Sequence, residues 1–373
     1  MEISRRLRST ATIALFCLSL TMLSYAQQIE EIKKLIDDGW WDDAAKLGRT
    51  QIKQYPDNPE INFLLGKACF LAGDYDDAED YLDKAIKLGE NGSDQLALSQ
   101  YHYWLANTKG IKAQKGGILK APGRAKACKS NYEKAIELQP ENLEARFGLL
   151  QYHMQAPGFV GGDKDKARAQ ADTIGYFDKI QGLKAQSMVA EFIDNDNPKA
   201  EDYLRQAMAM DTTNLDSYYW LGHFLARQDR MEEAESLSFK AQAIDSTDLN
   251  IYYSRASIYE GQRRYDKALA EYETIQQQDS TDLLADYQIA KTLILADTEM
   301  DRAESLLAKY IQAKHKGYWP DEAAARWRLA MALDKQGRTA EAIDELEKGL
   351  ESKPKYSEKE MKELLKELKK KGK

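Results

Sequence analysis

Histidines and paired carboxylates are the residues of this chain that could act in catalysis or hold a metal. The pairs Asp76-Asp77 and Glu232-Glu233 fall at the starts of expected helices, where negative charge stabilises the helix dipole. No histidine has a metal-binding spacing such as HExxH, and no Gly-x-Ser-x-Gly nucleophile motif occurs. The histidines are His102, His153, His223 and His315. The sequence therefore predicts a protein that is not an enzyme and has no metal or cofactor.

A basic segment is the second feature with chemical potential. Residues 95–132 contain no Asp or Glu and seven Lys or Arg, in a chain of formal net charge -8. Glycine-rich backbone beside lysines can bind an anion, although the P-loop spacing for nucleotides is absent. The alternative is a solvated loop whose charges are balanced by acidic neighbours. The candidate basic loop consists of Lys112, Lys115, Lys120 and Arg124.

Small residues recur along the chain and indicate the elements that must carry these side chains. Most intervals between them are 33 to 35 residues, and the longer ones are 39, 39 and 50. A period near 34 is typical of stacked helix pairs, in which small residues let neighbouring helices approach closely. The sequence therefore predicts an all-α chain. The recurring residues are Ala44, Ala78, Cys128, Ala167, Ala200, Ala234, Ala268, Ala303 and Ala342.

This pattern resembles the tetratricopeptide repeat (TPR). Leu65-Gly66, Leu221-Gly222 and Leu329-Ala330 match positions 7 and 8 of that repeat. The resemblance is to exported bacterial TPR proteins of unknown role. It implies a right-handed superhelical solenoid of about nine helix pairs over residues 27–352, with insertions near 109–127 and 156–163. Residues 353–373 are expected to form a capping helix that shields the last pair from water.

The resemblance also implies a concave groove lined by the first helix of each pair. Position 5 of that helix is aromatic in seven of eight pairs. Aromatic side chains give large, rigid contact area at low entropy cost, so these residues predict a groove for a peptide. The alternative is that the rings pack between adjacent pairs. The predicted groove residues are Phe63, Tyr103, Phe147, Tyr219, Tyr253, Tyr287 and Trp327, joined by His223 and Lys291 at position 9.

The first 26 residues predict a secretory signal peptide. Arg5, Arg6 and Arg8 precede an apolar run over residues 11–23, and Ser24-Tyr25-Ala26 provides a cleavage site. The run is shorter than the roughly 20 residues of a membrane span. We therefore expect an exported protein, periplasmic or secreted after cleavage, that contacts a membrane only if the signal stays uncleaved.

Together these features predict a non-enzymatic scaffold of the bacterial cell envelope. It would bind a peptide or protein segment in its concave groove. The alternative is binding of an anionic envelope polymer, a lipid headgroup or an acidic protein through the basic loop. Nucleic acid is not an expected partner, because a net charge of -8 opposes binding to a polyanion.

Overall fold

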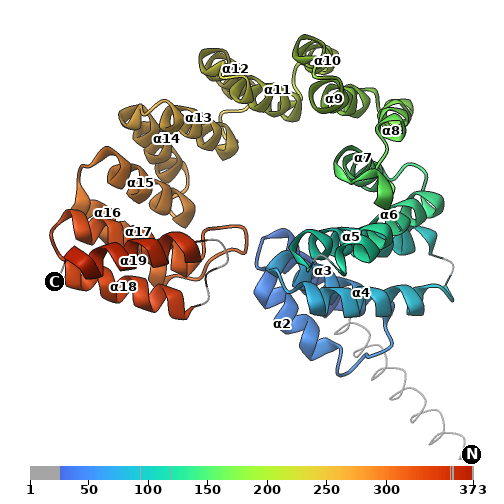
Figure 1. Ribbon diagram of the computed structural model, residues 1–373, viewed down its shortest axis with the longest axis horizontal. Coiled ribbons are helices and arrows are strands. Elements are labelled where there is room, and N and C mark those ends of the chain that lie inside the picture. Colours follow the sequence, from blue (N-terminus) through green and yellow to red (C-terminus); the bar gives the residue numbers. More distant parts are fainter. Residues whose placement is uncertain (1–25, 93, 118, 353, 355–356, 372–373) are drawn as a thin grey trace, which may run out of the picture. The chain divides into compact units, whose positions relative to one another are not determined.

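The computed structural model describes residues 26–92, 94–117, 119–352, 354 and 357–371. Every regular element in these ranges is a helix (Figure 1), which confirms the all-α prediction. The chain divides into two compact units, residues 1–170 and 171–373. Most of the predicted signal peptide lies outside the described residues. None of the helices in the described ranges combines the length and the apolar character that crossing a bilayer demands.

Unit 1 consists of helices that follow one another in pairs. The last helix of this unit, α8, continues beyond residue 170 into unit 2. Arg146 of α7 donates a hydrogen bond to Gln170 of α8 over 3.3 Å. The pairs are residues 26–37 with α2 (Trp41–Gln51), α3 (Pro59–Ala72) with α4 (Tyr75–Gly89), α5 (Gln95–Lys115) with α6 (Ala121–Leu138), and α7 (Leu143–Gln155) with α8 (Lys164–Phe177).

Unit 2 repeats the same construction and ends in a single helix. The pairs are α9 (Lys179–Val189), extended by the π-helical turn η2 (Ala190–Asp194), with α10 (Asn197–Met210); α11 (Leu215–Arg227) with α12 (Met231–Ile244); α13 (Leu249–Gly261) with α14 (Tyr265–Gln278); α15 (Leu283–Ala296) with α16 (Met300–Gln312); and α17 (Glu322–Lys335) with α18 (Thr339–Glu351). The final helix is α19 (Glu358–Lys371). The described residues therefore contain the nine predicted helix pairs.

The first helix of nearly every pair begins at an Asp or Asn. Asn58 accepts a hydrogen bond from the backbone N–H of Ile61, and Asp321 accepts one from Ala324. Such a cap satisfies an N–H group that has no partner inside the helix. The same arrangement starts α5, α7, α9, α11, α13 and α15. The caps therefore fix where each pair begins.

The recurring small residues are buried, as their spacing predicts. All nine, from Ala44 to Ala342, are at most 4% exposed. They lie in the second helix of each pair, where a larger side chain would push the helices apart. At the C-terminus, Met361 and Leu368 of α19 are fully buried, and α19 packs on α18. The last helix therefore caps the core of unit 2.

The expected insertion near residues 109–127 takes a different form. The two helices run through most of this range, and only residues 116–120 separate α5 from α6. Pro122 lies in the first turn of α6, where its missing N–H removes no helical hydrogen bond. The additional residues therefore lengthen both helices, to 21 residues in α5 and 18 in α6. The second insertion contains the short 3-10 helix η1 (Gly158–Val160).

Candidate functional site

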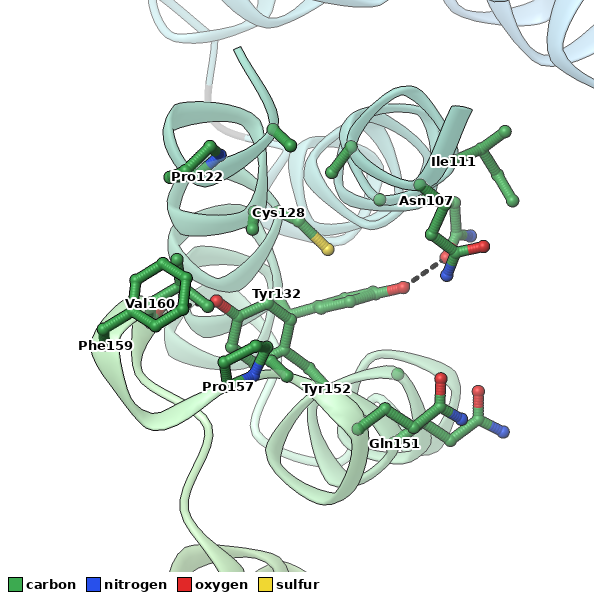
Figure 2. A pocket seen from close by; sticks show the side chains of 18 of the residues that line it. Asn107, Ile111, Pro122, Cys128, Tyr132, Gln151, Tyr152, Pro157, Phe159 and Val160 are labelled. Carbon is green, nitrogen blue, oxygen red and sulfur yellow. Dashed lines mark hydrogen bonds between the residues drawn. The ribbon is translucent and has the colours of Figure 1, made fainter. Parts of the chain in front are cut away.

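Unit 1 contains a pocket of about 690 Å³. It lies between α5, α6, α7 and η1 (Figure 2). Its volume is within the range typical of ligand sites. Residues of both insertions therefore line the same pocket.

The η1 wall is held in place by local contacts. The Tyr152 hydroxyl donates a hydrogen bond to the Val160 carbonyl over 2.7 Å, and the Val160 side chain is buried. Gly161 ends the turn with φ at 99°, a conformation that glycine adopts without strain. The backbone N–H of Gly162 returns a hydrogen bond to the Pro157 carbonyl over 3.2 Å. These contacts hold residues 157–162 against α7 as one wall of the pocket.

None of the side chains that line the pocket carries a charge. One side of the pocket is apolar and includes Pro122, Pro157 and Val160 (Figure 2). The side that holds Asn107 and Gln151 carries amide groups (Figure 2). In a chain that is 31% charged, such a lining selects for uncharged ligand groups, because a buried charge without a partner loses its hydration.

A tyrosine between the two sides is fixed by its neighbours. The Tyr132 hydroxyl donates a hydrogen bond to Oδ1 of Asn107 over 2.5 Å, and burial raises the pKa of Tyr132. Its ring packs over Gly148, where an added Cβ would lie 2.9 Å from the hydroxyl. Gly148 therefore leaves the space that this ring occupies, and Asn107 is held in one orientation.

We expect both cysteines of the described residues to react slowly in the folded protein. Burial raises the pKa of Cys69 and of Cys128 to about 12. The thiolate is the reactive form, so labelling by a disulfide reagent at pH 8 should be at least about a hundredfold slower than in urea. The measurement uses a chain with Cys17→Ser, so that only these two thiols report. Fast labelling of the native protein would contradict the buried position of Cys128 in the pocket wall.

One group of side chains in the described residues has the proximity that a metal site needs. It consists of Cys69, Asp74 and Asp77. Arg49 already donates to all three, over 3.6 Å to Cys69, 2.9 Å to Asp74 and 2.7 Å to Asp77. A metal ion would have to displace this guanidinium, so the group is better explained as an ion-pair cluster that joins α2 to the next helix pair.

The structure corrects one member of the predicted basic loop. The side chain of Lys112 is only 12% exposed and pairs with Asp76, over 2.5 Å, and with Glu79. Glu79 also binds Lys109. Burial alone would raise the pKa of Glu79, but the two lysines hold it below its usual value. The acidic partners come from α4, outside the basic segment, so Lys112 is neutralised and unavailable to an anion.

The other basic-loop residues differ in their contacts and in their exposure. Lys115 lies over the ring of Tyr75, at 4.8 Å from its centroid. Arg124 donates a hydrogen bond to the Lys112 carbonyl over 3.1 Å, and Lys120 is exposed. None of these residues lines the pocket. Anion binding through the loop stays a prediction that depends on Lys115, Lys120 and Arg124.

The predicted groove aromatics are divided between the units. In unit 1, the ring centroid of Phe63 lies 4.6 Å from that of Tyr101, and Tyr103 lies 6.3 Å from Tyr132. The third, Phe147, is half-buried. These contacts are packing contacts with neighbouring helices.

In unit 2, two groove tyrosines bond to the cap of the following pair. Tyr219 donates to Asp248 over 2.7 Å, and Tyr253 donates to Asp282 over 2.9 Å. Both carboxylates are caps of first helices. The half-buried Trp327 packs against the core, and its ring lies 4.3 Å from the Arg328 guanidinium. The tyrosines therefore have a structural role in joining successive pairs, and a ligand role for them stays a prediction.

One residue predicted for the groove needs correction. Tyr287 is only 6% exposed and packs on Tyr310 at 5.3 Å, so its ring cannot be a ligand surface. Lys291 pairs with Glu260 over 2.8 Å, and His223 is exposed. A groove role for these two residues stays a prediction. The aromatic spacing predicted either a peptide groove or packing between adjacent pairs, and at Tyr287 the ring packs.

Comparison with protein families identifies the repeat. Models described as tetratricopeptide repeat match residues 35–100, residues 296–357, and both 111–142 and 249–282. No curated protein matches the chain in sequence.

Solved structures also resemble the chain. A tetratricopeptide repeat protein from Parabacteroides merdae is 14% identical with a TM-score of 0.45, and the match covers 72% of this chain and 99% of that one. The human IFIT1 dimer with m7Gppp-AAAA is 16% identical with a TM-score of 0.46, and the match covers 83% of this chain and 80% of that one.

Proposed function

The chain belongs to the tetratricopeptide-repeat family, and from this premise we propose that it is a non-enzymatic scaffold of the bacterial envelope whose unit 1 pocket binds a segment of a partner protein. Tetratricopeptide repeats generally mediate protein binding. The pocket carries the proposal, because it is a large concave site and its lining is uncharged. A partner that buries apolar side chains there gains from the hydrophobic effect.

The envelope location rests on the sequence. Residues 1–26 have the basic start, apolar run and small-residue cleavage site of a secretory signal. An exported scaffold would meet its partner outside the cytoplasm. Comparing the mass of the mature chain from a cell-envelope fraction with that of the full sequence tests this, since cleavage after Ala26 leaves Gln27 as the first residue.

Cross-linking combined with filling of the pocket tests the binding site. Ala125 lines the pocket and is half-buried, so Ala125→Leu adds a side chain to the cavity without removing a core contact. We expect a photo-reactive amino acid at Gln114 to cross-link a partner protein in intact cells, and Ala125→Leu to abolish that product. The control is Ser130→Leu, an exposed position on the same helix, which should leave the product unchanged.

Two results would overturn the pocket as the binding site. One is a cross-linked product that persists at full yield in Ala125→Leu. The other is the same product from a photo-reactive residue at Gln312, an exposed position in unit 2, because that would show contact without site specificity.

A further inference from the structure

We infer that the partner segment bound in this pocket is an extended, uncharged stretch of chain whose main chain is held by glutamine amides. This inference rests on the proposed function and adds the chemistry of the segment. It depends on three observations: the unpaired amides of α5 and α7, the apolar wall opposite them, and a pocket lining without charged side chains.

The amide side offers hydrogen bonds that the protein itself does not use. Gln114, Gln151 and Gln155 line the pocket, are exposed, and have no hydrogen-bond partner within the described residues. A side-chain amide has both N–H donors and a carbonyl acceptor. Each residue of an extended chain directs its own N–H and C=O to the same side, so one glutamine can bond both main-chain groups of one residue.

The apolar side is suited to side chains of the same segment. Pro122, Val160 and Phe159 come from α6 and η1 and lie across from Gln151 (Figure 2). Phe159 is 74% exposed at this wall, which is unusual for a large ring and leaves apolar surface to cover. In an extended chain, alternate side chains point to opposite faces. Such a segment can therefore place its main chain near the amides and every second side chain on the apolar wall.

The charge distribution excludes other occupants. Lys109 and Lys112 of α5 pair with carboxylates of α4, and Lys115 of the same helix lies over the ring of Tyr75. No lysine or arginine is among the residues that line the pocket, so an acidic segment would find no partner in the lining. A fatty acyl chain would fill the apolar side but would cover the glutamine amides without bonding to them, and unpaired buried amides are unfavourable. An uncharged peptide satisfies both sides.

A displayed library of random decapeptides, panned on the full chain, tests the inference. We expect enriched peptides to lack Asp, Glu, Lys and Arg in their central positions. Synthetic copies should bind about tenfold more weakly to Gln151→Leu, the effect of a lost pair of hydrogen bonds. The matched control is Gln277→Leu, an exposed glutamine on α14, which should not change the affinity.

The outcomes separate this inference from the proposed function. Charged peptides whose binding is blocked by Ala125→Leu would keep the pocket as a protein site and overturn the uncharged segment. Equal affinity for wild type and Gln151→Leu would overturn the role of the amides. A third outcome is that Ala125→Leu weakens the binding of dodecanoate and leaves the binding of every enriched peptide unchanged. In that case the pocket binds an amphiphile and both proposals are wrong.

Discussion

Gly182→Ala is expected to lower the free energy of unfolding by about 3 kcal/mol, at the upper end of what overpacking usually does. Gly182 lies near the start of α9 and faces Gly175 near the end of α8. A Cβ at residue 182 would lie 2.7 Å from the Gly175 backbone nitrogen and would overlap its Cα. Only Asp178 separates the two helices, so the backbones cannot separate without breaking this connection.

Gly222→Ala is the matched control, because it places the same methyl group inside another helix. There the added Cβ meets only the Leu237 side chain at 3.9 Å, an ordinary contact. Alanine favours a helix by about 1 kcal/mol over glycine, so this variant should be as stable as wild type or slightly more. Urea unfolding followed by circular dichroism measures both. A Gly182→Ala variant as stable as Gly222→Ala would mean that α8 and α9 do not approach closely at these glycines.

The fold could be predicted because its determinants are local and repeated. Residues such as Ala78 and Ala268 stand at similar places in successive pairs, and each is fully buried. The long-range contacts could not be predicted so directly. The acidic partners of Lys112 come from the preceding pair. They lie outside residues 95–132, so the composition of that segment could not reveal them.

The pocket could not be predicted from the sequence, because residues of the two irregular insertions form much of its lining. Repeat numbering could not show that Tyr132 fixes Asn107. Nor could it show that the glycine-rich stretch around Phe159 closes against α6. The signal was present as two neighbouring insertions with Pro and Gly, and only three-dimensional packing converts it into a cavity.

Gly162→Ala is expected to open the η1 wall and abolish ligand binding in the pocket. A Cβ at residue 162 would lie 2.5 Å from the Ala156 carbonyl carbon and would overlap its oxygen. Because this is backbone, no side-chain rotation relieves the overlap, and the loop must separate from residue 156. The Tyr152–Val160 hydrogen bond would then break, and the apolar wall would leave the pocket. We expect local destabilisation of about 2 kcal/mol.

Gly158→Ala is the control from the same loop, because an added Cβ there meets no atom within 4 Å. Thiol labelling of Cys128 in the Cys17→Ser chain distinguishes the two variants without any knowledge of the ligand. Opening of the wall exposes this thiol, so Gly162→Ala should be labelled at least about tenfold faster than wild type, and Gly158→Ala at the wild-type rate. Equal rates in both variants would mean that η1 does not cover the pocket. Faster labelling of Cys128 with unchanged labelling of Cys69, which lies on α3, would place the effect at the wall and exclude unfolding of unit 1 as its cause.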